Sequence, residues 1–154
     1  MERWDLKPAD GGIYSDGWRP GGGGTLDVTS PGDGTVIGTI GIADDADVER
    51  AGLRAVEAQK TWGAASYRVR AEVLRKTADA LEEIRADVER VLVRESGSLP
   101  GKAHHEVEKV IDELREAAGL VTMSQGEILP VEDPTTIGIA RRIPVGVVGV
   151  IAPW

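Results

Sequence analysis

Eight consecutive residues at 145–152 carry neither a charged nor a polar side chain, and most of them are valine or isoleucine. A strand with one face in water alternates apolar and polar residues, whereas a continuous apolar run is typical of a strand buried on both faces of a parallel sheet. Parallel strands need crossover connections and neighbouring strands, and this run lies at the carboxyl end of the 154 residues. We therefore expect an α/β fold in which this strand begins a sheet that the sequence does not complete.

The composition indicates a folded domain without a cationic surface. Hydrophobic residues make up 41% and charged residues 29% of the chain, which excludes a disordered tail and a membrane protein. The net charge of -8 argues against nucleic acid or an anionic membrane as a partner. No basic segment followed by an apolar one stands at the start, so we expect no secretory signal and a cytoplasmic protein. Without cysteine, these residues can form no disulfide and supply no thiol nucleophile.

Residues 12–42 are rich in glycine and turn signals, and they predict β-hairpins. A tight turn is expected at Asp16-Gly17, within a short β-prone stretch. A second turn, which contains Pro31 and an Asp-Gly pair, separates two runs with strand-like patterns and is typical of a hairpin. The expected strands cover residues 12–18, 25–29 and 35–40.

Residues 44–125 carry apolar side chains at helical spacing. Asp44 precedes the first periodic segment, where a carboxylate can accept hydrogen bonds from the free amides of a first turn. The predicted helices are 45–62, ended by Gly63, then 66–94 with a possible break near residues 86–87, and 102–125. In the first helix we expect a buried stripe formed by Val48, Ala51, Ala55, Ala58 or Gln59, and Trp62. Amphipathic helices of this kind need a surface to cover, and a sheet is the natural candidate.

Three features that attract a functional interpretation are better explained structurally. The four glycines at 21–24 are not followed by the Gly-Lys-Ser/Thr sequence of a phosphate-binding loop, so we interpret them as a flexible surface turn. His104 and His105 are adjacent, and neighbouring residues on a helix point in directions too different to bind one metal. The acidic pairs at 44–45 and 82–83 have no partner base. The sequence therefore predicts no metal site and no catalytic residue.

Residues 135–143 predict one more strand. The segment is β-prone, and Pro134 and Pro144 bound it. It ends in Arg141 and Arg142, which favours a place at an edge or an interface over the centre of a sheet.

Three stretches carry a resemblance to a known family. Residues 12–40 contain Asp-Gly-Trp and Val-Thr-Ser-Pro-x-Asp-Gly-x-Val-Ile, residues 94–98 read Arg-Glu-Ser-Gly-Ser, and residues 144–154 read Pro-Val-Gly-Val-Val-Gly-Val-Ile-Ala-Pro-Trp. Together they resemble the amino-terminal part of the NAD(P)-dependent aldehyde dehydrogenases. The last stretch is similar to the family signature Pro-x-Gly-Val-x-x-x-Ile-x-Pro-Trp-Asn-Phe-Pro. Residues 94–106 and 126–130 further resemble the benzaldehyde and vanillin dehydrogenase group.

The resemblance implies a domain organisation. Residues 1–134 would form the amino-terminal part of a Rossmann-like cofactor domain, with hairpins over 12–42 and helices over 44–125. Residues 135–143 would supply a hairpin strand through which the protein forms a homo-oligomer. Residues 144–154 would be the first parallel strand of the cofactor domain.

The resemblance also implies a cofactor site and a substrate. Ile151, Ala152, Pro153 and Trp154 would line the site for NAD or NADP, beyond the carboxyl end of a strand, where open α/β sheets bind their ligands. Taken without the resemblance, Pro153 and Trp154 indicate only the end of a strand. The substrate would be a small aromatic aldehyde, which the parent enzyme oxidises to a carboxylic acid.

Other residues of the family mechanism are not among these 154. They are the asparagine that follows the tryptophan, the nucleophilic cysteine, the activating glutamate and the glycine-rich cofactor turn. Since no other side chain replaces a thiolate in this mechanism, we expect a truncated enzyme that is inactive by itself. Two alternatives remain: a non-catalytic module that pairs with an intact relative, and a three-helix interaction domain with disordered ends.

Overall fold

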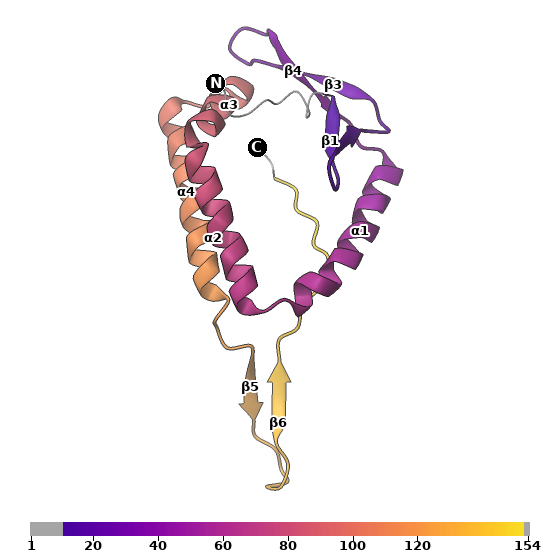
Figure 1. Ribbon diagram of the computed structural model, residues 1–154, viewed down its shortest axis with the longest axis vertical. Coiled ribbons are helices and arrows are strands. Elements are labelled where there is room, and N and C mark those ends of the chain that lie inside the picture. Colours follow the sequence, from indigo (N-terminus) through magenta and orange to yellow (C-terminus); the bar gives the residue numbers. More distant parts are fainter. Residues whose placement is uncertain (1–10, 153–154) are drawn as a thin grey trace.

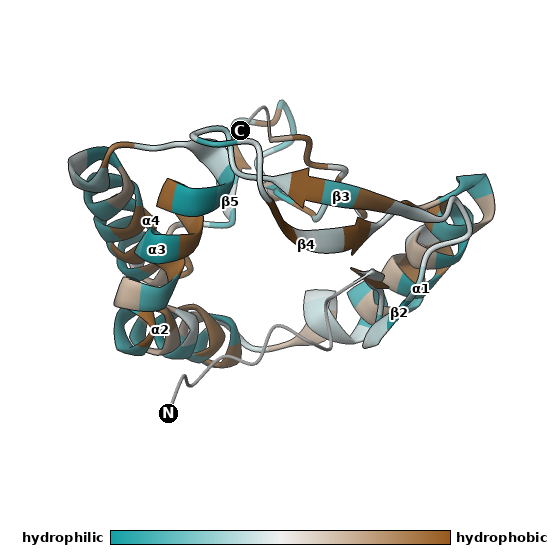
Figure 2. Cartoon of the chain, turned by 90° about the horizontal axis from the view of Figure 1, so that it is seen from above, coloured by the Kyte–Doolittle hydropathy of each residue, from teal (hydrophilic) through white to brown (hydrophobic). Residues whose placement is uncertain are grey.

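The computed structural model describes residues 11–152, which form three two-stranded antiparallel hairpins and four helices. Helices α2, α3 and α4 lie together on one side and α1 stands on the other (Figures 1 and 2). The β1–β2 hairpin lies beside α1, and the turn of the β3–β4 hairpin reaches toward α3. The third hairpin projects away from the helices. The elements are β1 (Gly12–Tyr14), β2 (Trp18–Pro20), β3 (Thr25–Thr29), β4 (Val36–Gly41), α1 (Asp45–Ala64), α2 (Tyr67–Glu83), α3 (Arg85–Ser96), α4 (Pro100–Leu120), β5 (Gly126–Leu129) and β6 (Gly138–Arg141).

The two predicted amino-terminal hairpins are confirmed. Strands β1 and β2 pair antiparallel around a turn in which Asp16 has φ 57° and Gly17 has φ 109°. Strands β3 and β4 pair with Leu26 opposite Ile40, and the N–H of Ser30 donates to the carbonyl of Thr35 at 2.8 Å across the turn. An Asp-Gly pair tolerates the left-handed backbone of such turns, which explains why these positions were readable from the sequence.

Helix α1 begins where the sequence predicts but buries no apolar stripe. Asp44 caps it: the Asp44 carboxylate accepts from the Asp47 N–H at 2.8 Å, and the Asp47 carboxylate accepts from the Asp44 N–H at 3.2 Å. The helix continues through Gly63 to Ala64, two residues beyond the expected end at Trp62. The predicted buried stripe is wrong, because Val48 is 65% exposed and Trp62 is 45% exposed. No other helix within the described residues packs closely enough on α1 to cover it.

Helices α2, α3 and α4 form the apolar core. Ile111 is 1% exposed and packs with Ala78 and Val107, and four half-buried side chains surround them: Leu81, Val88, Leu92 and Leu114. The break in the second predicted helix is confirmed, but it falls at Ile84 instead of residues 86–87. The third predicted helix begins earlier than expected, with Pro100 in its first turn, where the missing N–H costs nothing.

Helix α4, the third predicted helix, also ends earlier than expected, at Leu120 instead of residue 125. The carbonyl of Gln125 accepts from the N–H of Arg142 at 2.7 Å, so that residue already belongs to the base of the third hairpin. Strand β6 lies within the predicted 135–143 and pairs with β5, with Ile128 opposite Ile139. The strand is shorter than predicted because Thr135 and Thr136 hydrogen-bond to the carboxylate of Asp133 in the preceding turn.

The apolar run at 145–152 differs most from the expectation. It is extended chain with no ladder partner among the described residues, and Val145 is 91% exposed. The expected burial on both faces is therefore wrong for this structure. The reason is that a parallel strand is defined by neighbours, and no strand within residues 11–152 lies beside it.

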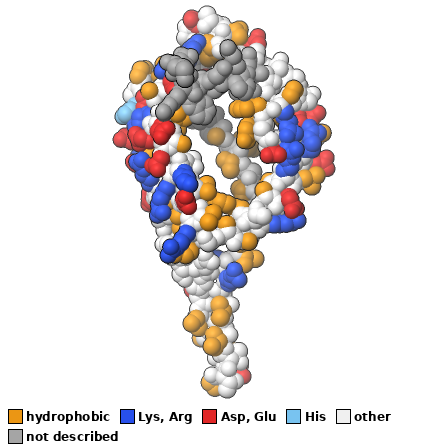
Figure 3. Space-filling view, in the orientation of Figure 1, with side chains coloured by type: hydrophobic (Ala, Val, Ile, Leu, Met, Phe, Trp, Pro, Cys, Tyr) orange, Lys and Arg blue, Asp and Glu red, His pale blue; other side chains and the backbone are white. Residues whose placement is uncertain are grey.

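The total accessible surface is 11906 Å². A folded monomer of 16.4 kDa exposes about 7,500 Å² by the usual scaling with mass. Many large apolar side chains are exposed, and hydrophobic groups gather along the opening between α1 and α2 and on the β5–β6 hairpin (Figure 3). Within residues 11–152, none of the helices has both the length and the apolar character needed to cross a membrane.

Candidate functional site

The predicted cofactor residues lie at the end of the extended apolar run. Ile151 is 97% exposed and Ala152 is also exposed. Pro153 and Trp154 lie outside the described residues. Apart from the indole N–H of Trp154, the segment has no side-chain donor or acceptor, so it can contribute mainly apolar contact and backbone hydrogen bonds. This chemistry fits the face of a flat ring or a ribose, which needs an apolar wall.

The β5–β6 hairpin and Gly146 set the direction in which the run at 145–152 leaves the hairpin. The N–H of Arg142 bonds to the base of the hairpin, so the run leaves the hairpin on the side of the helices (Figure 1). Gly146 has φ 106°, a backbone conformation that residues with a side chain rarely adopt. The run therefore starts with a bend that only glycine accommodates without strain.

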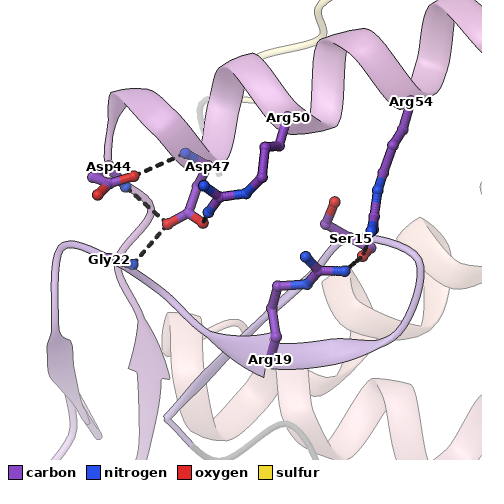
Figure 4. Close-up of polar contacts among 7 residues, drawn as sticks. All are labelled: Ser15, Arg19, Gly22, Asp44, Asp47, Arg50 and Arg54. Atoms are coloured by element: carbon purple, nitrogen blue, oxygen red, sulfur yellow. Dashed lines mark hydrogen bonds and ion pairs between the residues drawn. The ribbon is translucent and has the colours of Figure 1, made fainter.

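A second cluster, which sequence reasoning missed, joins α1 to the glycine loop at 21–24. The carboxylate of Asp47 accepts from the N–H of Gly22 at 2.7 Å and contacts the guanidinium of Arg50 (Figure 4). These donors, with the Asp44 N–H, hold the pKa of Asp47 below its usual value of 3.8, the Gly22 amide having the largest effect. We refer to Gly22, Asp44, Asp47 and Arg50 as the Asp47 cluster.

The glycine loop is a surface turn, as predicted, and backbone hydrogen bonds anchor it to the end of the second hairpin. The N–H of Gly23 donates to the carbonyl of Ile42 at 2.9 Å, and the N–H of Ile42 donates back to Gly24 at 2.8 Å. A Cβ atom at Gly21 would overlap the carbonyl of Ile42, and one at Gly22 would overlap the carboxylate of Asp44. The signal for this anchor was Asp47, a second carboxylate in the first turn, but its partner is 25 residues away in the sequence.

Two arginines, Arg19 in β2 and Arg54 in α1, hold the β1–β2 turn against α1. Arg19 and Arg54 both donate to the carbonyl of Ser15, at 2.5 and 2.8 Å (Figure 4). Arg54 also lies 3.6 Å from the carboxylate of Asp16. These hydrogen bonds and this ion pair all lie within the protein, so we interpret the cluster as structural.

An open cleft of about 540 Å³ lies between the start of α2 and the end of α4. Its chemistry is mixed, with two arginines, one glutamate, one tyrosine and small apolar groups. Glu72 in this cleft is paired with Lys76 at 2.7 Å, and the hydrogen bond from Lys76 lowers the pKa of the Glu72 carboxyl. The lining residues are Tyr67, Arg68, Ala71, Glu72, Arg75, Ala118, Val121 and Thr122.

The two histidines do not share a site. The Nδ1 atom of His104 lies 2.8 Å from a carboxylate oxygen of Glu89, which links α4 to α3, and His105 is exposed. The geometry matches the expectation that adjacent histidines point apart. Within residues 11–152, no three histidine, aspartate or glutamate side chains come together in a way that could hold a metal ion.

The hairpins, the helices and the apolar run together define a mixed α/β fold that corresponds to part of a larger known one. The sequence profile described as the aldehyde dehydrogenase family matches residues 18–154. The chain belongs to the aldehyde dehydrogenase family.

Relatives of known activity are similar over nearly the whole chain. Vanillin dehydrogenase of Amycolatopsis sp. is 40% identical over 153 residues, which cover 99% of this chain and 30% of that protein. The NAD(+) benzaldehyde dehydrogenase of Pseudomonas putida is 36% identical over 144 residues, with 94% and 30% covered. The chain thus spans about a third of the length of these relatives.

Solved structures show the same fold. A NAD-dependent benzaldehyde dehydrogenase from Corynebacterium glutamicum superposes with a TM-score of 0.77 and 27% identity, over 87% of this chain and 29% of the other. Betaine aldehyde dehydrogenase from Staphylococcus aureus, in complex with NAD+, gives a TM-score of 0.77 at 26% identity, with 84% and 26% covered. The expected α/β fold, an amino-terminal portion of the dehydrogenase architecture, is confirmed.

Proposed function

We propose that this chain is the amino-terminal portion of an NAD(P)-dependent dehydrogenase that oxidises an aromatic aldehyde to a carboxylic acid. The observation that carries the proposal is the similarity over nearly the full chain to a vanillin and a benzaldehyde dehydrogenase. The exposed apolar surface supports it, because surface of this kind is normally buried against further protein.

In the complete enzyme, Ile151, Ala152, Pro153 and Trp154 would line the cofactor site. When bound, NAD(P)+ would accept the hydride released by the substrate. The residues of this chain would hold the flat faces of the cofactor and exclude water, since the segment has no group that can transfer a proton. The absence of cysteine among the 154 residues supports the view that this part of the fold binds and the remainder reacts.

A chimera tests the assignment. Residues 1–154 would replace the matching segment of the Amycolatopsis vanillin dehydrogenase, and formation of NADH from vanillin would be followed by absorbance. We expect the chimera to oxidise vanillin. A chimera that folds as the parent enzyme does, yet shows no turnover, would contradict the proposal.

The cofactor residues can be tested in the same chimera. Replacing Trp154 or Ile151 by alanine should raise the KM for NAD about tenfold, because each removes apolar contact from one face of the cofactor. The control is Val36→Ala on β4, which shortens an apolar side chain outside the segment and should leave the KM unchanged. An unchanged KM in both test variants would argue that the segment only ends a strand.

The 154 residues alone should not turn over an aldehyde. Purified chain with benzaldehyde and either NAD+ or NADP+ is expected to give no absorbance change at the wavelength of the reduced cofactor. Measurable reduction above a blank without enzyme would show that the thiolate is dispensable and would overturn this part of the proposal.

We further propose that the segment 135–143 mediates homo-oligomer formation through the β5–β6 hairpin. The hairpin projects from the body, and its apolar side chains are exposed on both strands, including Ile128 and Ile139. Ile139→Lys would place a charge on that surface, and light scattering after gel filtration of the chimera should then show smaller particles than without the substitution. An unchanged particle mass would contradict this role.

A second candidate function is a non-catalytic module that pairs with an intact aldehyde dehydrogenase. The exposed run at 145–152 favours it, because an unpaired apolar segment can add to the edge of another sheet. Co-expression with the Amycolatopsis enzyme distinguishes the candidates: a module would co-purify with it in fixed stoichiometry. The hypothesis of a helical interaction domain with disordered ends is weakened by the ordered hairpins on both sides of the helices.

A further inference from the structure

The buried apolar residues of the described chain all lie on α2 and α4. They are Ala71, Ala78, Ala103, Val107, Ile111 and Ala118. Helix α1 contributes a single buried residue, and it is a carboxylate, Asp47. The contact between α1 and the amino-terminal hairpins is therefore fastened by polar groups, whereas α2, α3 and α4 are held together by apolar packing.

The Asp47 carboxylate is the centre of that polar contact. Its side chain is 3% exposed, and it accepts from the loop amide of Gly22, from the backbone N–H of Asp44 and from Arg50. Hydrogen bonds to an ionised acceptor are about twice as strong as neutral ones. One side chain thus joins the glycine loop, the end of β4 and the first turns of α1.

The glycine loop is shaped to reach this carboxylate. Gly21 and Gly22 have no room for a Cβ atom, because the carbonyl of Ile42 and the carboxylate of Asp44 already occupy that space. A longer side chain at either position would push the loop away and break the bond from the Gly22 amide. The glycines and Asp47 therefore act together, from opposite sides of one contact.

Besides Asp47, the Arg54 guanidinium ties α1 to the β1–β2 turn, because it donates to the carbonyl of Ser15 at 2.8 Å. The ion pair between Arg54 and Asp16 is exposed on both sides, and exposed pairs contribute little to stability. The hairpins and α1 are connected to α2–α4 in two ways. The chain passes from α1 to α2 through Ala65 and Ser66, and Pro31 lies against Gly97.

We propose that β1–β4 and α1 open as one local unfolding unit, separate from α2–α4, and that Asp47 couples the hairpins to α1 within it. Polar contacts hold β1–β4 and α1 together, whereas an apolar core holds α2–α4 together. The two units therefore differ in the free energy of opening. This inference concerns the folded chain and holds whether or not the proposed dehydrogenase activity is correct.

Amide hydrogen exchange of the 154-residue chain, followed by mass spectrometry, tests the proposal. In Asp47→Asn we expect exchange across residues 12–64, the span of β1–β4 and α1, to accelerate about tenfold, since the variant loses a charge-assisted cap and the anchor of the glycine loop. Amides at 103–111 in α4 should keep their original rates. Asp45→Asn is the matched control, because it removes the same charge from the same helical turn at an exposed position, and it should change neither region.

Gly22→Ala attacks the same contact from the side of the loop and leaves the carboxylate in place. It should reproduce the pattern of Asp47→Asn, with the acceleration confined to residues 12–64. Equal acceleration in α4, or loss of protection throughout the chain, would show a single cooperative unit and overturn the proposal. Unchanged exchange at residues 12–64 in both variants would show that Asp47 does not couple the hairpins to α1.

Discussion

The ring of Pro31, in the turn between β3 and β4, lies directly against Gly97, the residue that ends α3. A Cβ atom on Gly97 would stand 2.8 Å from the Cγ atom of Pro31. Gly97 also has φ 67°, the left-handed conformation typical of a helix C-cap. Two independent reasons, backbone conformation and close approach, thus require glycine at a position where the hairpins meet the helices.

We predict that Gly97→Ala destabilises the chain by about 2 kcal/mol, of which about 1 kcal/mol comes from the left-handed backbone. Urea denaturation measures the change. Gly34→Ala is the matched control, because Gly34 has φ 73° but open space around its missing Cβ atom. Gly34→Ala should lower the free energy of unfolding only by the part that comes from the left-handed backbone, about 1 kcal/mol. Adding Pro31→Ala to Gly97→Ala should recover the contact part, and an equal cost of Gly97→Ala with and without Pro31 would contradict the packing argument.

Neighbouring positions on α4 should differ strongly in their sensitivity to truncation. Ile111 is 1% exposed and touches the core, whereas Val110 is 50% exposed. Ile111→Ala should lower the free energy of unfolding by about 2 to 4 kcal/mol through lost burial and a cavity. Val110→Ala should change it by less than about 0.5 kcal/mol. Thermal or urea unfolding of the two variants gives the comparison, and similar losses would place the core elsewhere.

The elements that the sequence predicted well are those with local causes. Asp44 caps α1 because its carboxylate reaches an amide three residues away, and the Asp16-Gly17 turn follows from the backbone freedom of those residues. Signals of this kind need no knowledge of the rest of the fold. The same is true of the break in the second helix, apart from its shift to Ile84.

The features that the sequence could not predict depend on contacts between residues that are far apart in the chain. Helical spacing predicted a stripe on α1 that includes Val48, but burial requires something to cover the stripe, and no element within the described residues does. The loop at 21–24 is held by Asp47, whose contribution is invisible without the three-dimensional approach of the two segments. The run at 145–152 has the composition of a strand and lacks the neighbour that makes one.

The role of the cofactor residues stays a prediction for the same reason. The family resemblance assigns Ile151 and Ala152 to the cofactor site, and the assignment agrees with the rule that ligands bind beyond the carboxyl ends of parallel strands. The described chain contains no parallel pair, so the sheet edge against which they would act is not formed.

Acid should destabilise the chain through two turn carboxylates. The hydroxyl of Thr35 is the main cause that lowers the pKa of Asp33, and the hydroxyl of Thr135 does the same for Asp133, below the usual value of 3.8 in each case. A carboxyl group whose pKa is lower in the folded state than in the unfolded state stabilises the fold at pH values above the unfolded pKa. This stabilisation is lost as the pH falls through the folded pKa. We expect the Tm to be constant from about pH 7 to 5 and to fall below about pH 4.

The double variant Asp33→Asn, Asp133→Asn should have a lower Tm at neutral pH and a shallower fall in acid, because it no longer has the two carboxylates to protonate. Asp27→Asn, which removes an exposed carboxylate from β3, should keep the acid dependence of the original chain. A double variant whose acid dependence equals that of the Asp27 control would show that other groups dominate.

The exposed run at 145–152 should govern self-association of the 154-residue chain. Val150 is 85% exposed in a segment that is apolar, β-prone and uncharged, which is the composition of sequences that pair with other chains. Val150→Lys should lower the rate of aggregation several-fold, measured by static light scattering at 37 °C, because a charge in the run opposes strand pairing. Met123→Lys is the control, since Met123 is also an exposed apolar residue but lies outside the run, and it adds the same charge. If both substitutions slow aggregation equally, net charge and not the run controls association.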